Sequence, residues 1–293
     1  MKRNICLILM MVIIFFSCKD NYIPETEGEQ LVVEGWIKDG EYPVVMLMTS
    51  VDVEMNTRDI KELYEHIGNW GRVVVSDGEK SVILTGMYDT DYYPPYVYTT
   101  TDIKGVAGKT YTLDVVYNKH HAMAVTTIPA PVKLDSITQS RVEDNDTLWS
   151  LSAHFVAPQG KCYYSLFNKI GADAQQFIKC DVGTFDNSAV NPEMLHPKNV
   201  TYPVYRTKTL DDYYGVTEYF VEGDTVCVEL CTMDSTSFNV WLDYQNIASL
   251  SGNMFVPYTR SIRTNIVGGY GYWCGYGASH KWTVIGRTIQ NLR

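Results

Sequence analysis

A stretch rich in glycine and aromatic residues near the end of the chain, NIVGGYGYWCGYGAS at 265–279, is the first place where clustered side chains suggest chemistry. A dinucleotide-binding loop needs a glycine three positions after Gly271, where Cys274 stands instead, and no Gly-Lys-Ser/Thr follows. The alternation predicts a strand, because successive side chains of a strand point to opposite faces. The candidates for ligand or partner contact in this strand are Tyr270, Tyr272, Trp273 and Tyr276.

A second aromatic cluster surrounds a double proline in MYDTDYYPPYVYTT at 87–100. Proline stiffens the loop, and rigid exposed rings lose little entropy when they bind a sugar, a peptide or a protein partner. Tyrosine is also a common strand residue, so packing against a sheet is the alternative for each ring. The contact candidates here are Tyr92, Tyr93, Tyr96 and Tyr98.

The sequence contains no pattern of catalytic or metal-ligating residues that would define an active site. None of the six histidines stands in H-E-x-x-H or H-x-H spacing, and the adjacent His120 and His121 face opposite sides of a predicted strand. Neither a G-x-S-x-G elbow nor an S-x-x-K motif occurs. We therefore predict no metal, no cofactor, no catalytic residue and no enzymatic activity. Two carboxylates that meet only in the folded chain keep a hydrolase of glycans or peptides open as an alternative.

Charge and cysteine content exclude two further classes of site. The formal net charge is −10 and no basic run of five residues occurs, so we expect no nucleic-acid binding, which needs clustered Lys and Arg. No C-x-x-C spacing indicates a redox or zinc site. Beyond the N-terminal region an odd number of cysteines remains, whose pairing stays open: Cys162, Cys180, Cys227, Cys231 and Cys274.

The elements that must position these residues are mainly strands. The chain has 22 tyrosines, and short alternating runs such as LVVEGWI at 31–37 recur between turn signals, of which the Asp-Gly pair at 77–78 is the strongest. Helical spacing is limited to 57–69 and 234–252. This predicts a mainly β protein: an N-terminal antiparallel β-sandwich, Ig-like or transthyretin-like, followed by a second β-rich region with one or two short helices.

Proline-rich IPAPVKLDSI at 128–137 is the best candidate for a boundary between two domains. We predict a β-sandwich domain at 30–130 and a second β-rich domain at 131–293.

The N-terminus has the pattern of an export signal. Lys2 and Arg3 precede a twelve-residue apolar run, too short to span a membrane, which ends in a lipobox-like Phe-Phe-Ser-Cys. We predict a signal peptide at 1–17, a lipid anchor on Cys18 and a flexible polar tether at 18–29. The predicted partner of this region is the membrane, through the lipid on Cys18.

Three segments in order resemble one bacterial family. They are LVVEGWI at 31–37 soon after the lipobox, GVAGKTYTLDV to AVTTIPAPVKLDSI within 105–137, and SIRTNIVGGYGYWCGYGAS at 261–279. Together they resemble the Bacteroidetes lipoproteins grouped as the domain of unknown function 4249 family. The resemblance implies an outer-membrane lipoprotein that is encoded beside a TonB-dependent transporter, with no catalytic residues to carry over.

We therefore expect a non-catalytic lipoprotein on the outer membrane, at the cell surface or on the periplasmic face. The Lys-Asp pair directly after Cys18 resembles in part the Lys-acidic signal that sends some Bacteroidetes lipoproteins to the cell surface. Its role would be to capture a glycan, a peptide or a small nutrient for TonB-dependent uptake, or to act as a partner of the transporter. The alternatives are a structural or adhesive lipid-anchored β-sandwich module and a hydrolase. The ligand, the oligomeric state and the choice between ligand and protein partner stay open at this point.

Overall fold

The computed structural model describes residues 29–50, 64–143, 145–174, 176–188, 192, 196–207, 218–250 and 262–286. The predicted signal peptide, the lipidation site Cys18 and nearly all of the predicted tether lie outside the described residues. So does most of the helix predicted at 57–69, of which Tyr64 and Glu65 are helical in the described part. Among the described residues, no helix combines the length and the apolar character needed to cross a membrane.

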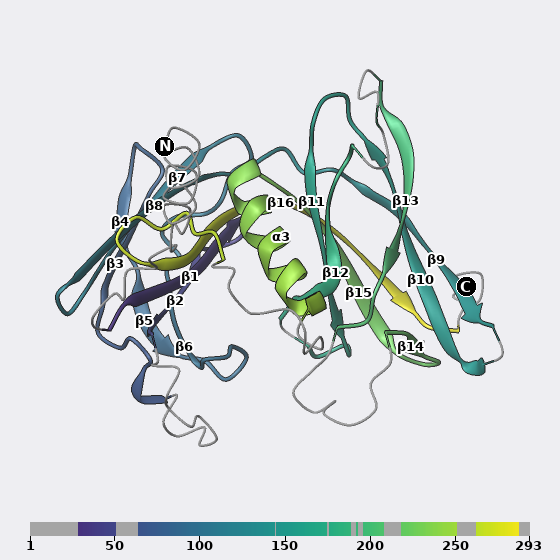
Figure 1. Ribbon diagram of the computed structural model, residues 1–293, viewed down its shortest axis with the longest axis horizontal. Helices are drawn as coiled ribbons and strands as arrows, with labels where there is room; N and C mark the ends of the chain where they lie inside the picture. The colour runs from purple at the N-terminus through teal and green to yellow at the C-terminus, as the bar shows by residue number, and fades with distance from the viewer. Residues whose placement is uncertain are drawn as a thin grey trace, which may run out of the picture.

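The chain is mainly β, as predicted, and most strand pairs are antiparallel (Figure 1). The helix predicted at 234–252 is confirmed as α3. In chain order the elements are β1 (Leu31–Lys38), β2 (Val44–Thr49), β3 (Arg72–Ser76), β4 (Ser81–Ile83), β5 (Thr85–Tyr88), β6 (Tyr96–Thr99), β7 (Thr110–Tyr117), β8 (His120–Thr127), β9 (Leu134–Val142), β10 (Asn145–Ala157), β11 (Tyr163–Ile170), β12 (Ile178–Asp186), β13 (Lys198–Val204), β14 (Phe220–Val221), β15 (Thr225–Met233), α3 (Ser235–Leu250) and β16 (Tyr270–Val284).

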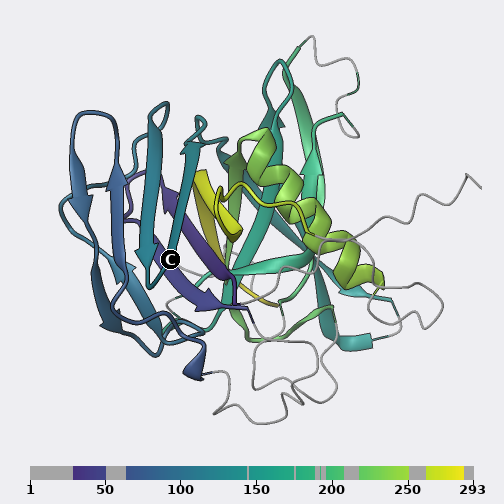
Figure 2. The same ribbon diagram turned by 60° about the vertical axis from the view of Figure 1, so that its left-hand side comes forward.

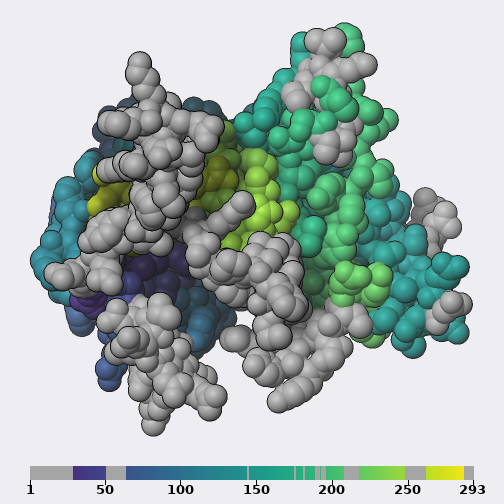
Figure 3. All heavy atoms as spheres, viewed as in Figure 1, coloured from purple at the N-terminus to yellow at the C-terminus, as the bar shows by residue number. Residues whose placement is uncertain are grey.

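One eight-stranded sheet, with the order β12-β11-β15-β16-β1-β2-β6-β5, runs through both halves of the molecule. Two four-stranded sheets accompany it, β4-β3-β7-β8 from the first half and β13-β10-β14 with β9 from the second. We call the eight-stranded sheet the central sheet. Figure 3 shows α3 between the purple-to-blue first half and the green second half.

Alternation along β1 and β16 separates the two faces of the central sheet. Leu31, Val33 and Trp273 are fully buried against β3, β7 and β8 residues in a first core cluster, and we call this side the core face. Even-numbered residues of the same two strands point to the other side, where α3 packs. We call that side the cavity face.

A second core cluster lies on the core face of β11 and β15, against the sheet of β9, β10, β13 and β14. It contains Leu151, Tyr164 and Leu230, all buried. The first cluster draws on residues from 31 to 128 together with Ile266 and Trp273, and the second on residues from 134 to 285. The predicted domain limits themselves stay a prediction.

Strand β16 links the two halves, because it lies parallel to β1 on one side and antiparallel to β15 on the other (Figure 2). The segment 127–131 crosses the core face of β16 on its way from the first half to the second. Gly275 donates its N–H to the Thr126 hydroxyl at 2.8 Å, and a Cβ added at Gly277 would clash with the carbonyl oxygen of Pro129. Glycines in this strand therefore permit close backbone approach.

Gly271 has the strictest requirement in β16. Its φ of +102° lies in a region that residues with a side chain rarely adopt, and an added Cβ would clash with the carbonyl oxygen of Val33 on β1. Both the positive φ and the close contact with Val33 require a residue without a Cβ atom. The parallel pairing of β1 and β16 therefore depends on glycine at this position.

We predict that Gly271→Ala lowers the free energy of unfolding more than Gly78→Ala does. Gly78 also has a positive φ, of +88°, but a Cβ there meets nothing within 4 Å. The control should lose about 1–2 kcal/mol for the backbone conformation alone, and Gly271→Ala about 1–3 kcal/mol more for the clash. Urea unfolding of both variants measures the difference, and equal losses would contradict the role given to the contact with Val33.

Candidate functional site

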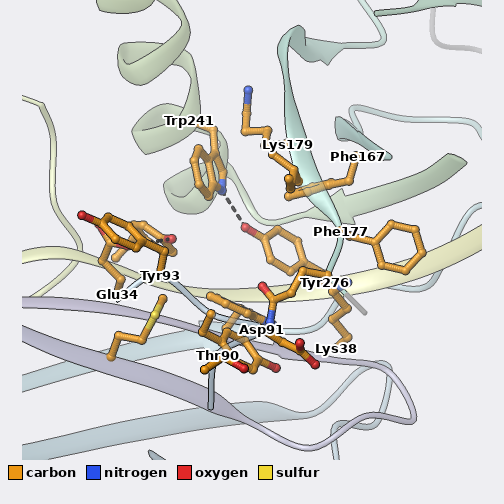
Figure 4. A pocket seen from close by; sticks show the side chains of 16 residues that line it. Glu34, Lys38, Thr90, Asp91, Tyr93, Phe167, Phe177, Lys179, Trp241 and Tyr276 are labelled. Carbon is orange, nitrogen blue, oxygen red and sulfur yellow. Dashed lines mark hydrogen bonds between the residues drawn. The ribbon is translucent and has the colours of Figure 1, made fainter. Parts of the chain in front are cut away.

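A cavity of about 670 Å³ opens on the cavity face of the central sheet (Figure 4). It lies between β1 and β16, the loop from β5 to β6, the start of β12, and α3. Aromatic side chains make up much of its wall. The lining residues are Glu34, Trp36, Lys38, Met46, Thr90, Asp91, Tyr92, Tyr93, Phe167, Gln176, Phe177, Ile178, Lys179, Trp241, Tyr272 and Tyr276.

The floor of the cavity comes from strands at opposite ends of the chain. Alternation in β1 brings Glu34, Trp36 and Lys38 to one face. The parallel register sets Glu34 beside Tyr272 and Lys38 beside Tyr276. An acid, a base and two phenols thus share one floor, although Glu34 and Tyr272 are 238 positions apart in the sequence.

Helix α3 covers the floor through Trp241. Its indole Nε1 donates a hydrogen bond to the Tyr276 hydroxyl at 2.6 Å, and its ring centroid lies 4.8 Å from that of Tyr272. The helix begins after Asp234, whose carboxylate accepts the N–H of Ser237 at 2.7 Å and so caps the first turn. These contacts fix the aromatic wall before any ligand binds.

Lys38 and Glu229 form a buried ion pair at the end of the cavity nearest β15. Nζ lies 2.6 Å from Oε2, and the two side chains are 8% and 1% exposed. Burial lowers the pKa of Lys38, but the surrounding negative groups, with Glu229 first among them, together outweigh this, so the pKa of Lys38 lies above its usual value. The ammonium also lies 4.8 Å from the ring centroid of Phe177. Lys38 is therefore charged and already neutralised by the protein.

Glu34 lies at the other end of the cavity and, unlike Lys38, has no ion-pair partner among the described residues. The single contact that reaches its carboxylate within the described part of the chain is a long one, 3.5 Å from the Tyr272 hydroxyl to Oε2. Burial raises the pKa of Glu34, and the hydrogen bond from Tyr272 lowers it by less. Burial together with the charge of Glu34 raises the pKa of Tyr244 on α3 to about 12. The structure thus holds a carboxylate in a site that disfavours its charge.

The cavity gathers half of the aromatic residues that the sequence singled out. Tyr92 and Tyr93 from the proline loop line it together with Tyr272 and Tyr276 from β16, and the Tyr92 ring centroid lies 6.1 Å from that of Trp36. The side chain of Tyr93 is 56% exposed.

The other four predicted contact residues lie away from the cavity. Tyr98 and Trp273 are buried in the first core cluster, and Tyr96 packs against it. The Tyr98 hydroxyl donates to the carbonyl of Gly68 and accepts the N–H of Gly71, as a structural side chain does. Tyr270 is 42% exposed and is not part of the lining.

Several lining residues were missed by reading the sequence, foremost Glu34, Trp36, Lys38 and Trp241. A signal existed in β1, because LVVEGWIK alternates apolar and polar or aromatic positions and thus gives one face three unusual side chains. Phe167 and Phe177 carried no such signal, since an apolar ring in a strand or at its start is ordinary.

Within the described ranges, no group of three His, Cys, Asp or Glu side chains gathers in a metal-binding arrangement. None of the cysteines at 162, 180, 227, 231 and 274 is joined in a disulfide, which answers the pairing question that the sequence left open.

Family membership follows from a match that spans most of the chain. The family model for a domain of unknown function, DUF4249, matches residues 19–281 of the sequence. The chain belongs to the DUF4249 family. The resemblance seen in the three sequence segments is confirmed.

Other comparisons add little to the DUF4249 assignment. No curated protein shows significant similarity to the chain. Among solved structures, the chicken interferon gamma receptor alpha chain is similar at 11% identity, over 70% of this chain and 89% of that one, with a TM-score of 0.17. A TM-score this low carries no argument about fold or function.

We predict that the Lys38–Glu229 pair behaves as a coupled unit. Lys38→Met or Glu229→Met alone should lower the free energy of unfolding by about 3–5 kcal/mol, because each leaves an uncompensated buried charge. The double variant should lose clearly less than the sum of the two, since no charge remains. Denaturant unfolding of all four proteins measures the coupling, and additive losses would show that the two charges act separately.

We predict that Glu34→Gln stabilises this DUF4249 protein at pH 7, by on the order of 1 kcal/mol, a typical single-site effect. The pKa of Glu34 in the folded protein exceeds its ordinary value of 4.5, so the wild type loses stability as the pH rises from there through the folded-state pKa. Glutamine removes this loss and still accepts the Tyr272 hydroxyl.

The measurement is urea unfolding of both proteins between pH 4 and pH 8. The stability gained by Glu34→Gln should grow with pH and then level off. Glu79→Gln, on a side chain that is 85% exposed, is the matched control and should show no such trend. A lower stability of Glu34→Gln at pH 7 would contradict the unfavourable burial of the charge.

Proposed function

We propose that this DUF4249 protein is a non-catalytic, lipid-anchored outer-membrane lipoprotein that captures a nutrient for a TonB-dependent uptake system. The cavity on the central sheet is the observation that carries the proposal. Its volume of about 670 Å³ falls within the range of about 300–1,000 Å³ in which small-molecule sites lie. Its aromatic walls suit sugar rings, peptides and other small nutrients.

Preorganisation supports binding as the role of the cavity. Trp241 is held by its hydrogen bond to Tyr276 and packs on Tyr272 at 4.8 Å between ring centroids, and the Tyr92 ring centroid lies 6.1 Å from that of Trp36. Walls that are already ordered lose little entropy when a ligand binds. A flat, exposed aromatic face would favour a protein partner, so the concave site favours capture over adhesion.

The chemistry of the lining supports a non-catalytic role. In the part of the chain that the structure describes, the lining contains no histidine, serine or cysteine, and its carboxylates are those of Glu34 on β1 and Asp91 in the loop from β5 to β6. Its lysine at 38 is held in the pair with Glu229. Recognition rather than reaction is what these side chains support.

The predicted anchor would keep the cavity close to the membrane. Residues 19–30 separate the proposed lipid on Cys18 from β1, whose side chains form the cavity floor. Twelve residues span at most about 40 Å when fully extended. A ligand bound here would therefore stay within reach of a transporter in the same membrane.

We predict that the protein co-purifies with a large β-barrel receptor when native membranes are solubilised mildly and the lipoprotein is captured. Repeated recovery of the lipoprotein alone would contradict the transporter partnership. Cys18→Ala is the control for anchoring, since it should release the protein from the membrane fraction. Trp241→Ala is the control for the cavity: it should retain the anchor and the receptor but impair uptake of the nutrient.

A further inference from the structure

We propose that the Glu34 end of the cavity binds a positively charged group of the ligand, an ammonium or a guanidinium, between its carboxylate and the surrounding aromatic rings. This inference rests on the proposed function, because it treats the cavity as a ligand site. It assigns the chemical class of the ligand, which the aromatic walls alone leave open.

The carboxylate of Glu34 lacks a positive partner within the described residues. The Tyr272 hydroxyl at 3.5 Å is the one group there that contacts it, and a contact of that length compensates a desolvated charge poorly. Lys38 follows four positions along the same strand, about 13 Å away by strand geometry, and is engaged with Glu229. The site therefore provides a negative charge without an internal cation to balance it.

The net charge of the described cavity lining also favours a cationic ligand. With Lys38 neutralised by Glu229, the described lining keeps two carboxylates, those of Glu34 and Asp91, against the ammonium of Lys179. Figure 4 shows the Lys179 side chain directed away from the sheet and from Glu34. A cationic ligand group would complete the balance, whereas a neutral one would leave the half-buried carboxylate of Glu34 uncompensated.

Aromatic rings complete the recognition of a cation. Glu34 shares its end of the cavity with Tyr272, Trp241, which packs on Tyr272, and Tyr93. Cations are attracted to the faces of such rings, most strongly to tryptophan. The protein already uses this contact for its own lysines, with Lys38 Nζ 4.8 Å from the ring centroid of Phe177 and Lys179 Nζ 5.5 Å from that of Trp241.

A neutral sugar is the competing ligand class. Because Glu34 ionises, the pH dependence of the affinity distinguishes a cationic ligand from a neutral sugar. The pKa of Glu34 is raised by burial, so a cation should bind more tightly as the pH rises through that pKa and the carboxylate ionises. The other titratable groups that face it are Tyr272 of β16, Tyr244 of α3, Asp91 of the proline loop and Lys38 of β1. Both phenol pKa values are raised, so the tyrosines stay neutral over the relevant range.

The test is calorimetric titration of the intact protein with two matched pairs of probes. Choline is compared with its neutral carbon analogue 3,3-dimethylbutan-1-ol, and the peptide Gly-Lys-Gly with the same peptide acetylated on the lysine. At least one cation should bind about tenfold more tightly than its neutral counterpart, a ratio typical of one desolvated charge pair. Its affinity should rise between pH 5 and pH 8.

Glu34→Gln should reduce the cation affinity about tenfold and abolish its pH dependence, since the carboxylate is lost while the shape is kept. Glu79→Gln, on the surface of the first half, should change neither. Thermal unfolding of both variants checks that the fold is retained. A loss of cation binding in a variant that is at least as stable as the wild type separates a binding role from a structural one.

Two results would overturn the inference. One is a neutral probe, or a neutral oligosaccharide, that binds as well as the cations and is unaffected by Glu34→Gln; the cavity would then remain a ligand site of another class. The other is that neither cation binds more tightly than its neutral counterpart. The receptor pull-down does not depend on ligand charge, so it judges the proposed function separately in both cases.

Discussion

The central sheet exists because its last strand in sequence, β16, lies between the first strand of one half and the last strand of the other. Parallel pairing with β1 and antiparallel pairing with β15 turn two separate β-sheets into one surface. Removal of β16 would leave β1 and β15 each with an unpaired edge in the middle of the molecule. Both core clusters and the cavity therefore depend on this one placement.

The ion pair between Lys38 and Glu229 reaches across β16 from the strand on one side to the strand on the other. Buried pairs of this kind add little net stability, but a misplaced partner is costly because it leaves one charge unpaired in the interior. The observed register sets Lys38 beside Tyr276 and Glu229 beside His280, and in it the two charges meet. The pair thus favours one alignment of three strands, and with it one shape of the cavity floor.

Local patterns in the sequence predict the strands, the helix α3 and the alternation of residues in β16, because each depends on neighbours within a few positions. They do not predict that β1 and β16 pair, since a contact between residues 238 positions apart leaves no local period. Alternation also fails to say which face is covered. Tyr98 and Trp273 occur in the same aromatic runs as Tyr93 and Tyr272, yet the first two lie in the core and the others line the cavity. Local patterns also miss Glu34, because the environment that sets it apart is formed by Tyr272 and α3, which surround it only in the folded chain.

The Glu34 carboxylate opposes folding although it serves the proposed binding, whereas the rest of the cavity stabilises the fold. The aromatic walls stabilise the fold as they stand, because their rings pack on one another and Trp241 bonds to Tyr276. A carboxylate under those rings opposes folding, since burial disfavours its charge and the described neighbours supply no cation. Packing alone would be served better by glutamine or by an apolar side chain at this position. Unfavourable groups of this kind concentrate in binding and catalytic sites, where a ligand supplies the missing interaction, and this marks the Glu34 end of the cavity as its functional part.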